Sequence, residues 1–101
     1  MKENMEIKQS ELDALDELVQ LKLKRPEFRK RWKYLDGEYQ LAKLIIQHRV
    51  GLNMTRKDLA SKAKTTLSVI TRIESLSVSV TFRMASRIAS ALGKTLQISF
   101  V

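Results

Sequence analysis

Basic and hydroxyl side chains alternate with apolar ones between residues 54 and 74. Guanidinium and ammonium groups bind phosphates; arginine, serine and threonine also hydrogen-bond to base edges, where leucine can contact a thymine methyl. Candidates for base edges and nearby phosphates are Thr66, Leu67, Ser68, Thr71 and Arg72, candidates for the DNA backbone are Arg56, Lys57, Lys62 and Lys64, and Thr65 is a further DNA-binding candidate. The pattern therefore favours nucleic-acid binding, with Arg72 placed to contact guanine O6 and N7.

Two short helices joined by a tight turn are predicted to position these side chains. Thr55 and Asp58 are typical of a capping box at the start of the first helix, and Thr66 is typical of an N-cap for the second. The apolar face of the second helix consists of Val69, Ile70 and Ile73. A helix with one apolar side and one basic, polar side is typical of the second helix of a helix-turn-helix, which enters the major groove. An ordinary helical hairpin is the alternative.

The net charge of +8 is unevenly distributed along the 101 residues. Residues 1–38 hold nine acidic and nine basic side chains, whereas residues 39–101 hold ten basic ones against two acidic ones. The excess positive charge therefore falls in the segment that carries the predicted helix-turn-helix, as expected for a phosphate-binding surface.

The composition argues against an enzyme, a metal site or a cofactor. The chain has no cysteine, one histidine and three glycines, and it shows no glycine-rich phosphate loop, metal-ligand cluster or nucleophile–base pair. No apolar run approaches membrane-spanning length, and the N-terminus lacks the apolar core of a signal peptide. We therefore expect a soluble, cytoplasmic protein without a membrane partner.

Helical periodicity dominates the rest of the chain. After polar residues 1–9, Ser10 is predicted to start a helix, and Pro26 suits the first position of the next one. Ser79 is predicted to cap the last helix and Gly93 to end it. The domain organisation that follows is an N-terminal helical extension at 1–36, a helix-turn-helix DNA-binding domain at 37–94 and a C-terminal segment at 95–101.

The C-terminal segment alternates apolar Leu96, Ile98 and Phe100 with polar residues, which is strand periodicity. No other segment is predicted to be a strand, and a lone strand leaves its backbone N–H and C=O groups unpaired. We therefore expect it to pair with another chain. That chain is either a second copy, which would make a homodimer, or a different protein.

The helix after Ser10 has an apolar side and an acidic side. It either packs on its own domain or docks another protein, and an acidic side would complement a basic partner. The candidate partner contacts are Glu11, Leu12, Asp13, Leu15, Asp16, Glu17 and Val19.

Four stretches from Arg25 onward follow the pattern of a known family. They are R-P-E-F-R-K-R-W-K-Y-L-D-G-E-Y-Q-L-A, R-V-G-L-N-M-T-R-K-D-L-A, T-T-L-S-V-I-T-R-I-E and I-A-S-A-L-G-K-T-L-Q-I-S-F-V. In these the chain resembles HigA-type antitoxins of bacterial toxin–antitoxin modules, within the Xre or lambda-repressor-like helix-turn-helix class. The resemblance implies an all-α fold: a five-helix helix-turn-helix domain with an N-terminal helical extension and one short C-terminal β-strand.

The resemblance also implies a function. It implies an antitoxin that binds and neutralises a RelE-like ribonuclease toxin, and a homodimer that represses its own operon at an inverted repeat of operator DNA. A structural ion pair between Arg49 and Glu74 is implied as well. Arg56 and Leu67 stand where the family commonly has glutamine, and Leu76 lies near a usual glycine, so the operator sequence stays open. The alternatives are an Xre-family repressor without a toxin, of phage type or chromosomal, and a helical scaffold protein.

Overall fold

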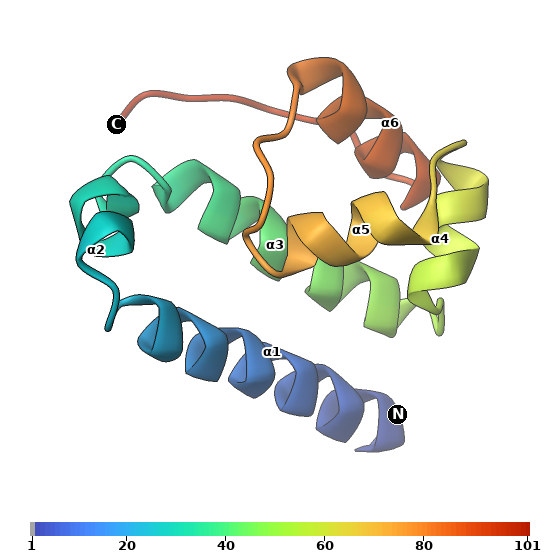
Figure 1. The fold of residues 1–101 in the computed structure, drawn as a ribbon. Coiled ribbons are helices and arrows are strands. Elements are labelled where there is room, and N and C mark those ends of the chain that lie inside the picture. Colours follow the sequence, from blue (N-terminus) through green and yellow to red (C-terminus); the bar gives the residue numbers. More distant parts are fainter. Residues whose placement is uncertain (1) are drawn as a thin grey trace.

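The computed structural model describes residues 2–101, which are helical apart from turns and a C-terminal tail (Figure 1). The helices are α1 (Lys2–Lys22), α2 (Pro26–Trp32), α3 (Asp36–Gly51), α4 (Arg56–Lys62), α5 (Leu67–Glu74) and α6 (Phe82–Ala91). The prediction of an all-α fold is confirmed. Among these described residues, no helix is both long enough and apolar enough to cross a membrane.

Helix α3 lies at the centre of the fold, with α1 along one side and α4, α5 and α6 on the other (Figure 1). Ile45 and Ile46 are consecutive and therefore point in different directions from α3, so each joins a different cluster of buried residues. The domain core consists of Ile45, Leu59, Ala60, Ala63, Ile70, Ile73, Ile88 and Leu92, and the α1 core consists of Leu15, Val19, Ala42, Ile46, Val50 and Leu76. The N-terminal helix is thus packed onto the helix-turn-helix domain.

Helices α3 to α6 end in the same backbone motif, in which the residue after the C-cap adopts the left-handed conformation. These residues are Asn53, Lys64, Leu76 and Gly93, with φ angles of 57°, 57°, 59° and 72°. In each case the next residue donates its N–H to the carbonyl five residues earlier, at 2.8–2.9 Å. Asparagine and glycine tolerate this conformation, whereas lysine and leucine are strained in it.

Three boundaries differ from the sequence-based predictions. Helix α1 begins at Lys2 rather than Ser10, because the intervening lysine, glutamate, methionine and glutamine residues favour a helix and no glycine or proline stops it. Helix α6 is capped by Thr81 rather than Ser79: the Thr81 hydroxyl accepts from the N–H of Met84 at 3.1 Å. The segment 37–94 holds α3 to α6, four helices rather than the predicted five, since α2 lies before it.

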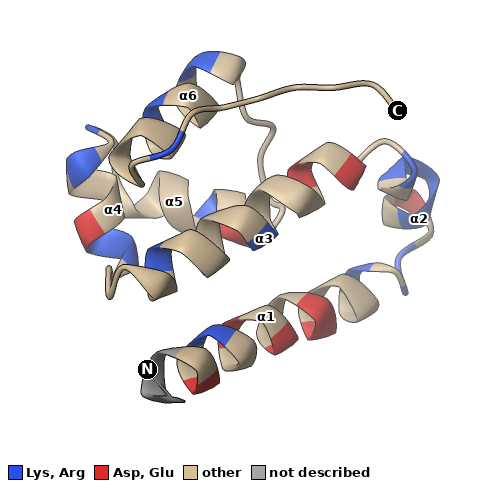
Figure 2. Ribbon diagram, turned by 180° about the vertical axis from the view of Figure 1, so that it is seen from behind, with Lys and Arg blue, Asp and Glu red and all other residues tan. Residues whose placement is uncertain are grey.

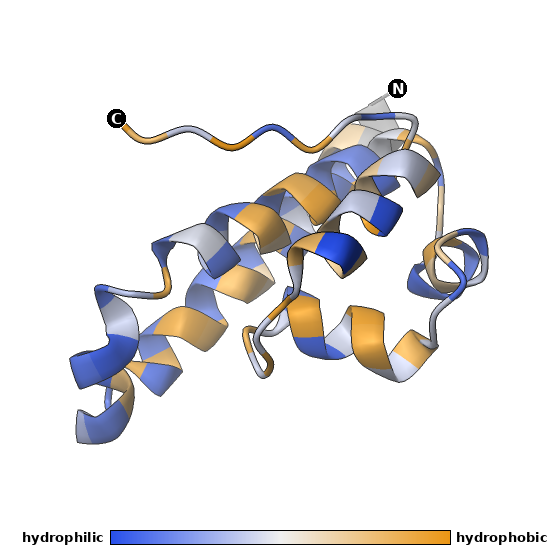
Figure 3. Ribbon diagram, turned by 90° about the horizontal axis from the view of Figure 1, so that it is seen from above, coloured by the Kyte–Doolittle hydropathy of each residue, from blue (hydrophilic) through white to orange (hydrophobic). Residues whose placement is uncertain are grey.

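The predicted C-terminal strand is not supported. Residues 95–101 run as an extended tail, along which apolar and polar residues alternate (Figure 3). Leu96 is half-buried and lines an apolar hollow with Leu41 and Leu44 of α3, whereas Ile98 and Phe100 are exposed. A strand is defined by its ladder of hydrogen bonds, and residues 2–101 contain no strand with which this tail could pair.

Candidate nucleic-acid interface

Threonine hydroxyls fix the starts of both α4 and α5. The Asp58 N–H donates to Thr55 Oγ1 at 3.0 Å, and the Thr55 N–H donates to Asp58 Oδ2 at 3.0 Å, so the predicted capping box is present. The backbone hydrogen bond from Thr55 holds the pKa of the Asp58 carboxyl below its usual value. At α5, Thr66 Oγ1 accepts from the N–H of Val69 at 3.2 Å. The sequence predicts these positions correctly because a capping hydroxyl and the N–H that donates to it are only three residues apart.

The turn between α4 and α5 is held from outside by Arg87 of α6. Its Nε donates to the carbonyl of Ala63 at 3.1 Å, and its Nη2 donates to the carbonyl of Lys64. A positive side chain at the C-terminal end of a helix also complements the helix dipole. The role of Arg87 is not predicted from the sequence, since no local pattern indicates a contact between residues more than twenty positions apart.

Helix α5 has one buried and one exposed side. Ile70 and Ile73 lie in the domain core. On the opposite side Leu67 is 48% exposed, and Ser68, Thr71 and Arg72 are exposed as well. The surface predicted to contact base edges is therefore open to solvent. We call the exposed residues Leu67, Ser68, Thr71 and Arg72 the reading face.

Basic residues lie on α4 and on the turn that joins it to α5 (Figure 2). Lys57, Lys62 and Lys64 are exposed, and Thr65 is half-buried beside them. Among the described side chains, none of these lysines forms an ion pair with a carboxylate. Their positive charge is therefore free to attract phosphate.

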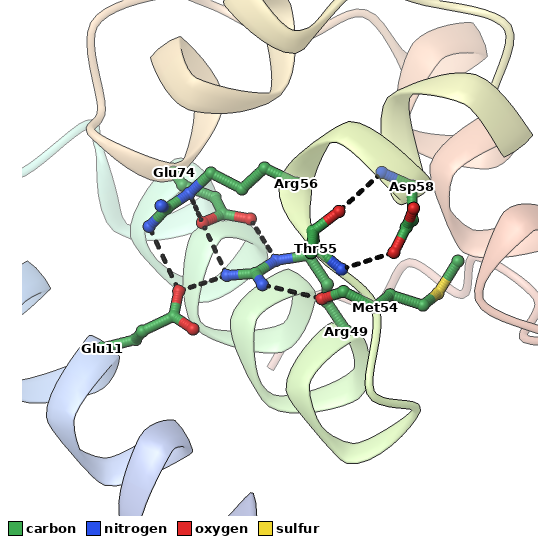
Figure 4. A network of polar contacts seen from close by, with 7 residues as sticks. All are labelled: Glu11, Arg49, Met54, Thr55, Arg56, Asp58 and Glu74. Carbon is green, nitrogen blue, oxygen red and sulfur yellow. Dashed lines mark hydrogen bonds and ion pairs between the residues drawn. The ribbon is translucent and has the colours of Figure 1, made fainter.

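Behind the reading face lies a cluster of two arginines and two glutamates (Figure 4). The ion pair expected between Arg49 and Glu74 is present, with Arg49 Nε 3.0 Å from Glu74 Oε2 and the two side chains only 4% and 3% exposed. Arg49 Nη1 also donates to the carbonyl of Met54 at 3.0 Å. Burial lowers the pKa of Arg49, but hydrogen bonds and attraction from Glu74 and Glu11 outweigh it and raise that pKa. The pair ties α3 to the end of α5.

Arg56, which is predicted to contact the DNA backbone, pairs with two glutamates in the folded chain. Its Nε donates to Glu74 Oε1 at 2.8 Å, and its Nη2 donates to Glu11 Oε1 at 3.1 Å (Figure 4). Glu11 belongs to α1 and also accepts from Arg49 Nη2. Glu11 is a candidate partner contact on the sequence, and no sequence pattern indicates that it approaches Arg56, 45 positions away.

The other candidate partner contacts on α1 differ in how far they are buried. Leu15 and Val19 are buried in the α1 core, and Leu12 is partly buried against it. Asp16 accepts a hydrogen bond from the hydroxyl of Tyr39. Asp13 accepts from Gln9 Nε2 at 2.8 Å within the helix, and Asp13, Asp16 and Glu17 are all exposed and form no ion pair among the described side chains. The apolar side of α1 therefore packs on its own domain, as one of the two interpretations expected.

The comparisons with known proteins agree with this geometry. A protein-family model described as helix-turn-helix matches residues 45–98, which is more than half of the chain. No curated protein and no solved structure matches significantly. The matched segment contains α4, the turn and α5 in full. The chain therefore belongs to the helix-turn-helix family of Xre and lambda-repressor type, and it is a DNA-binding transcription regulator.

Proposed function

We propose that this regulator is an antitoxin that represses its own operon. It binds operator DNA as a homodimer and neutralises a RelE-like ribonuclease toxin by binding it, in the cytoplasm and without catalysis or a cofactor. The support for the antitoxin role is the resemblance of residues 25–101 to HigA-type antitoxins. The support for DNA reading is the exposed side of α5.

The observation that carries DNA recognition is the contrast between the two sides of α5. Ile70 and Ile73 are buried, and the reading face is exposed beside unpaired lysines. In the proposed complex the reading face and the N-cap Thr66 lie in the major groove, with Arg72 on a guanine. Lys57, Lys62 and Lys64 contact phosphates and set the register.

Two features support the proposed homodimer: the extended C-terminal tail and the paired half-sites of an inverted-repeat operator. Ile98 and Phe100 are exposed apolar side chains on an extended backbone whose hydrogen-bonding groups have no ladder partner within the described chain. Two copies related by a twofold axis would contact half-sites about one helical turn apart.

Selection from a pool of random DNA duplexes tests base recognition directly. We expect an enriched inverted repeat, to which Arg72→Ala binds more weakly by about 1–3 kcal/mol, with relaxed preference at one base pair per half-site. Lys62→Ala is the control, because loss of a phosphate contact weakens binding to all sequences alike. If Arg72→Ala weakens every duplex equally, Arg72 does not contact a base.

The toxin partner is tested with the product of the neighbouring reading frame. We expect a small basic ribonuclease that co-purifies with this chain and whose toxicity is relieved by co-expression. The exposed acids Asp13 and Glu17 suit a basic partner. The second candidate function, repression without a toxin, is favoured by the burial of Leu15 and Val19, and it is supported if no such ribonuclease is encoded there.

A further inference from the structure

Helix α1 approaches the DNA-binding motif through one carboxylate. Glu11 Oε1 accepts from Arg49 Nη2 and from Arg56 Nη2, the latter at 3.1 Å (Figure 4). The Glu11 side chain is 22% exposed and that of Arg56 is 43% exposed, so both can be reached from solvent. Arg56 is therefore held between Glu11 of α1 and Glu74 of α5 while part of its side chain stays open to solvent.

Arg56 is the first residue of α4, directly after the N-cap Thr55. In helix-turn-helix complexes the first helix of the motif crosses the DNA backbone. The guanidinium of Arg56 therefore lies where a phosphate would approach. Glu11 and that phosphate are both anions, and they compete for the same side chain.

The net charge of the cluster depends on whether Glu11 is ionised and in place. With Glu11 in place, two glutamates balance two arginines. Without the charge of Glu11, Glu74 still neutralises the buried Arg49, and one positive charge remains on the exposed Arg56. That charge would be available for a phosphate contact.

Glu11 is not the only residue that holds α1 in place. Leu15 and Val19 anchor the helix in the α1 core, and Arg49 keeps Glu74 and the Met54 carbonyl as partners. The amide oxygen of a glutamine could still accept a hydrogen bond from Arg49. A change at Glu11 can therefore alter Arg56 while the fold is kept.

We propose that Glu11 is a positioning residue that draws Arg56 away from the DNA backbone, so that the docked α1 weakens DNA binding. The inference rests on the proposed DNA recognition and adds a control on it from outside the helix-turn-helix. Loss of the Glu11 charge creates one further arginine–phosphate contact in each half-site.

The test compares Glu11→Gln with Glu17→Gln in the full chain, on the duplex selected with the wild-type protein. Glu17 lies on the same helix, is exposed and forms no ion pair among the described side chains, so its substitution changes the net charge equally. We expect Glu11→Gln to bind about tenfold more tightly per half-site, as for a charged hydrogen bond. The slope of log affinity against log salt should steepen by about 0.9 for each new contact. Glu17→Gln should leave that slope unchanged.

A double-variant cycle shows whether the effect passes through Arg56. In an Arg56→Gln background, Glu11→Gln should have no more effect than Glu17→Gln. If the gain persists without Arg56, or if both glutamine variants behave alike in the wild-type background, the inference is overturned. If the proposed DNA recognition itself is wrong, the result differs from these outcomes, because the wild-type protein would then select no duplex.

Discussion

Arg49 and Glu74 are ionised groups inside the protein, and they are stable there because each has partners. Arg49 donates to Glu74, Glu11 and the carbonyl of Met54, and Glu74 also accepts from Arg56. Among the described side chains, no buried nitrogen or oxygen lacks a hydrogen bond. Removing Glu74 takes away the buried carboxylate and leaves Arg49 and Arg56 to share the single, partly exposed carboxylate of Glu11.

Glu74→Ala should therefore lower the free energy of unfolding by about 3–5 kcal/mol. The loss arises because Arg49 stays buried without its ion pair to Glu74. Urea denaturation measures it, and Glu17→Ala on an exposed position should change stability by less than about 0.5 kcal/mol. A loss under about 1 kcal/mol for Glu74→Ala would show that the cluster contributes little.

Lys64 and Leu76 share a left-handed backbone conformation but differ in burial: Lys64 is exposed, and Leu76 lies in the α1 core. Glycine at either position removes a backbone strain of about 1–2 kcal/mol from the folded state. It also makes the unfolded chain more flexible, which lowers the stability of the fold by about 0.5–1 kcal/mol. Lys64→Gly should therefore stabilise the fold by roughly 0.5–1 kcal/mol. Leu76→Gly should destabilise it, because loss of a buried leucine side chain costs about 2–5 kcal/mol. Thermal unfolding of the two variants should shift in opposite directions; shifts of the same sign would contradict this account.

At the scale of elements, the sequence predicts what is local and leaves open what depends on packing. Thr55, Asp58 and Thr66 show where α4 and α5 begin, since each signal acts within one helical turn. The periodicity of α5 also identifies its exposed side. The contacts of Glu11 and Arg87 could not be predicted, because they join helices that are distant in sequence and near only after folding.

Because α1 packs on the rest of the chain, removing it should lower the stability of the fold. A chain starting at Arg25 lacks Leu15 and Val19, so Ala42, Ile46 and other members of the α1 core would face water. We expect it to lose about 3–6 kcal/mol of stability, from about 1.5–3 kcal/mol for each of the two lost side chains. Its urea midpoint measures this, with a chain starting at Lys8 as the control. Unchanged stability would mean that α1 contributes little to the fold.

At the scale of the whole molecule, charge is arranged by helix. The zero balance of residues 1–38 conceals an acidic α1 and a basic α2, and α2 lies at the opposite end of the molecule from α4 (Figure 2). The all-helical fold follows from the sequence, since every long periodic segment is helical. The strand expectation at 95–101 failed because alternation alone provides no second strand.

Two triple variants with equal loss of charge separate contact from net charge. Substituting Lys57, Lys62 and Lys64 with glutamine should lower the slope of log affinity against log salt by about 0.9 for each lost phosphate contact. The same substitutions at Arg29, Lys30 and Arg31 of α2 should leave the slope nearly unchanged, because helix α2 lies at the opposite end of the molecule from α4. Salt titrations on the selected duplex measure both, and equal slopes would indicate that only the net charge matters.

Because one side of α1 is buried, any ligand of that side binds more weakly than it would bind to a free helix. Such a ligand must first lift the helix from α3, and the free energy of exposing Leu15 and Val19 is subtracted from its affinity. Lifting the helix would also release Arg56 from Glu11, so this ligand and DNA would each raise the affinity for the other by the same factor.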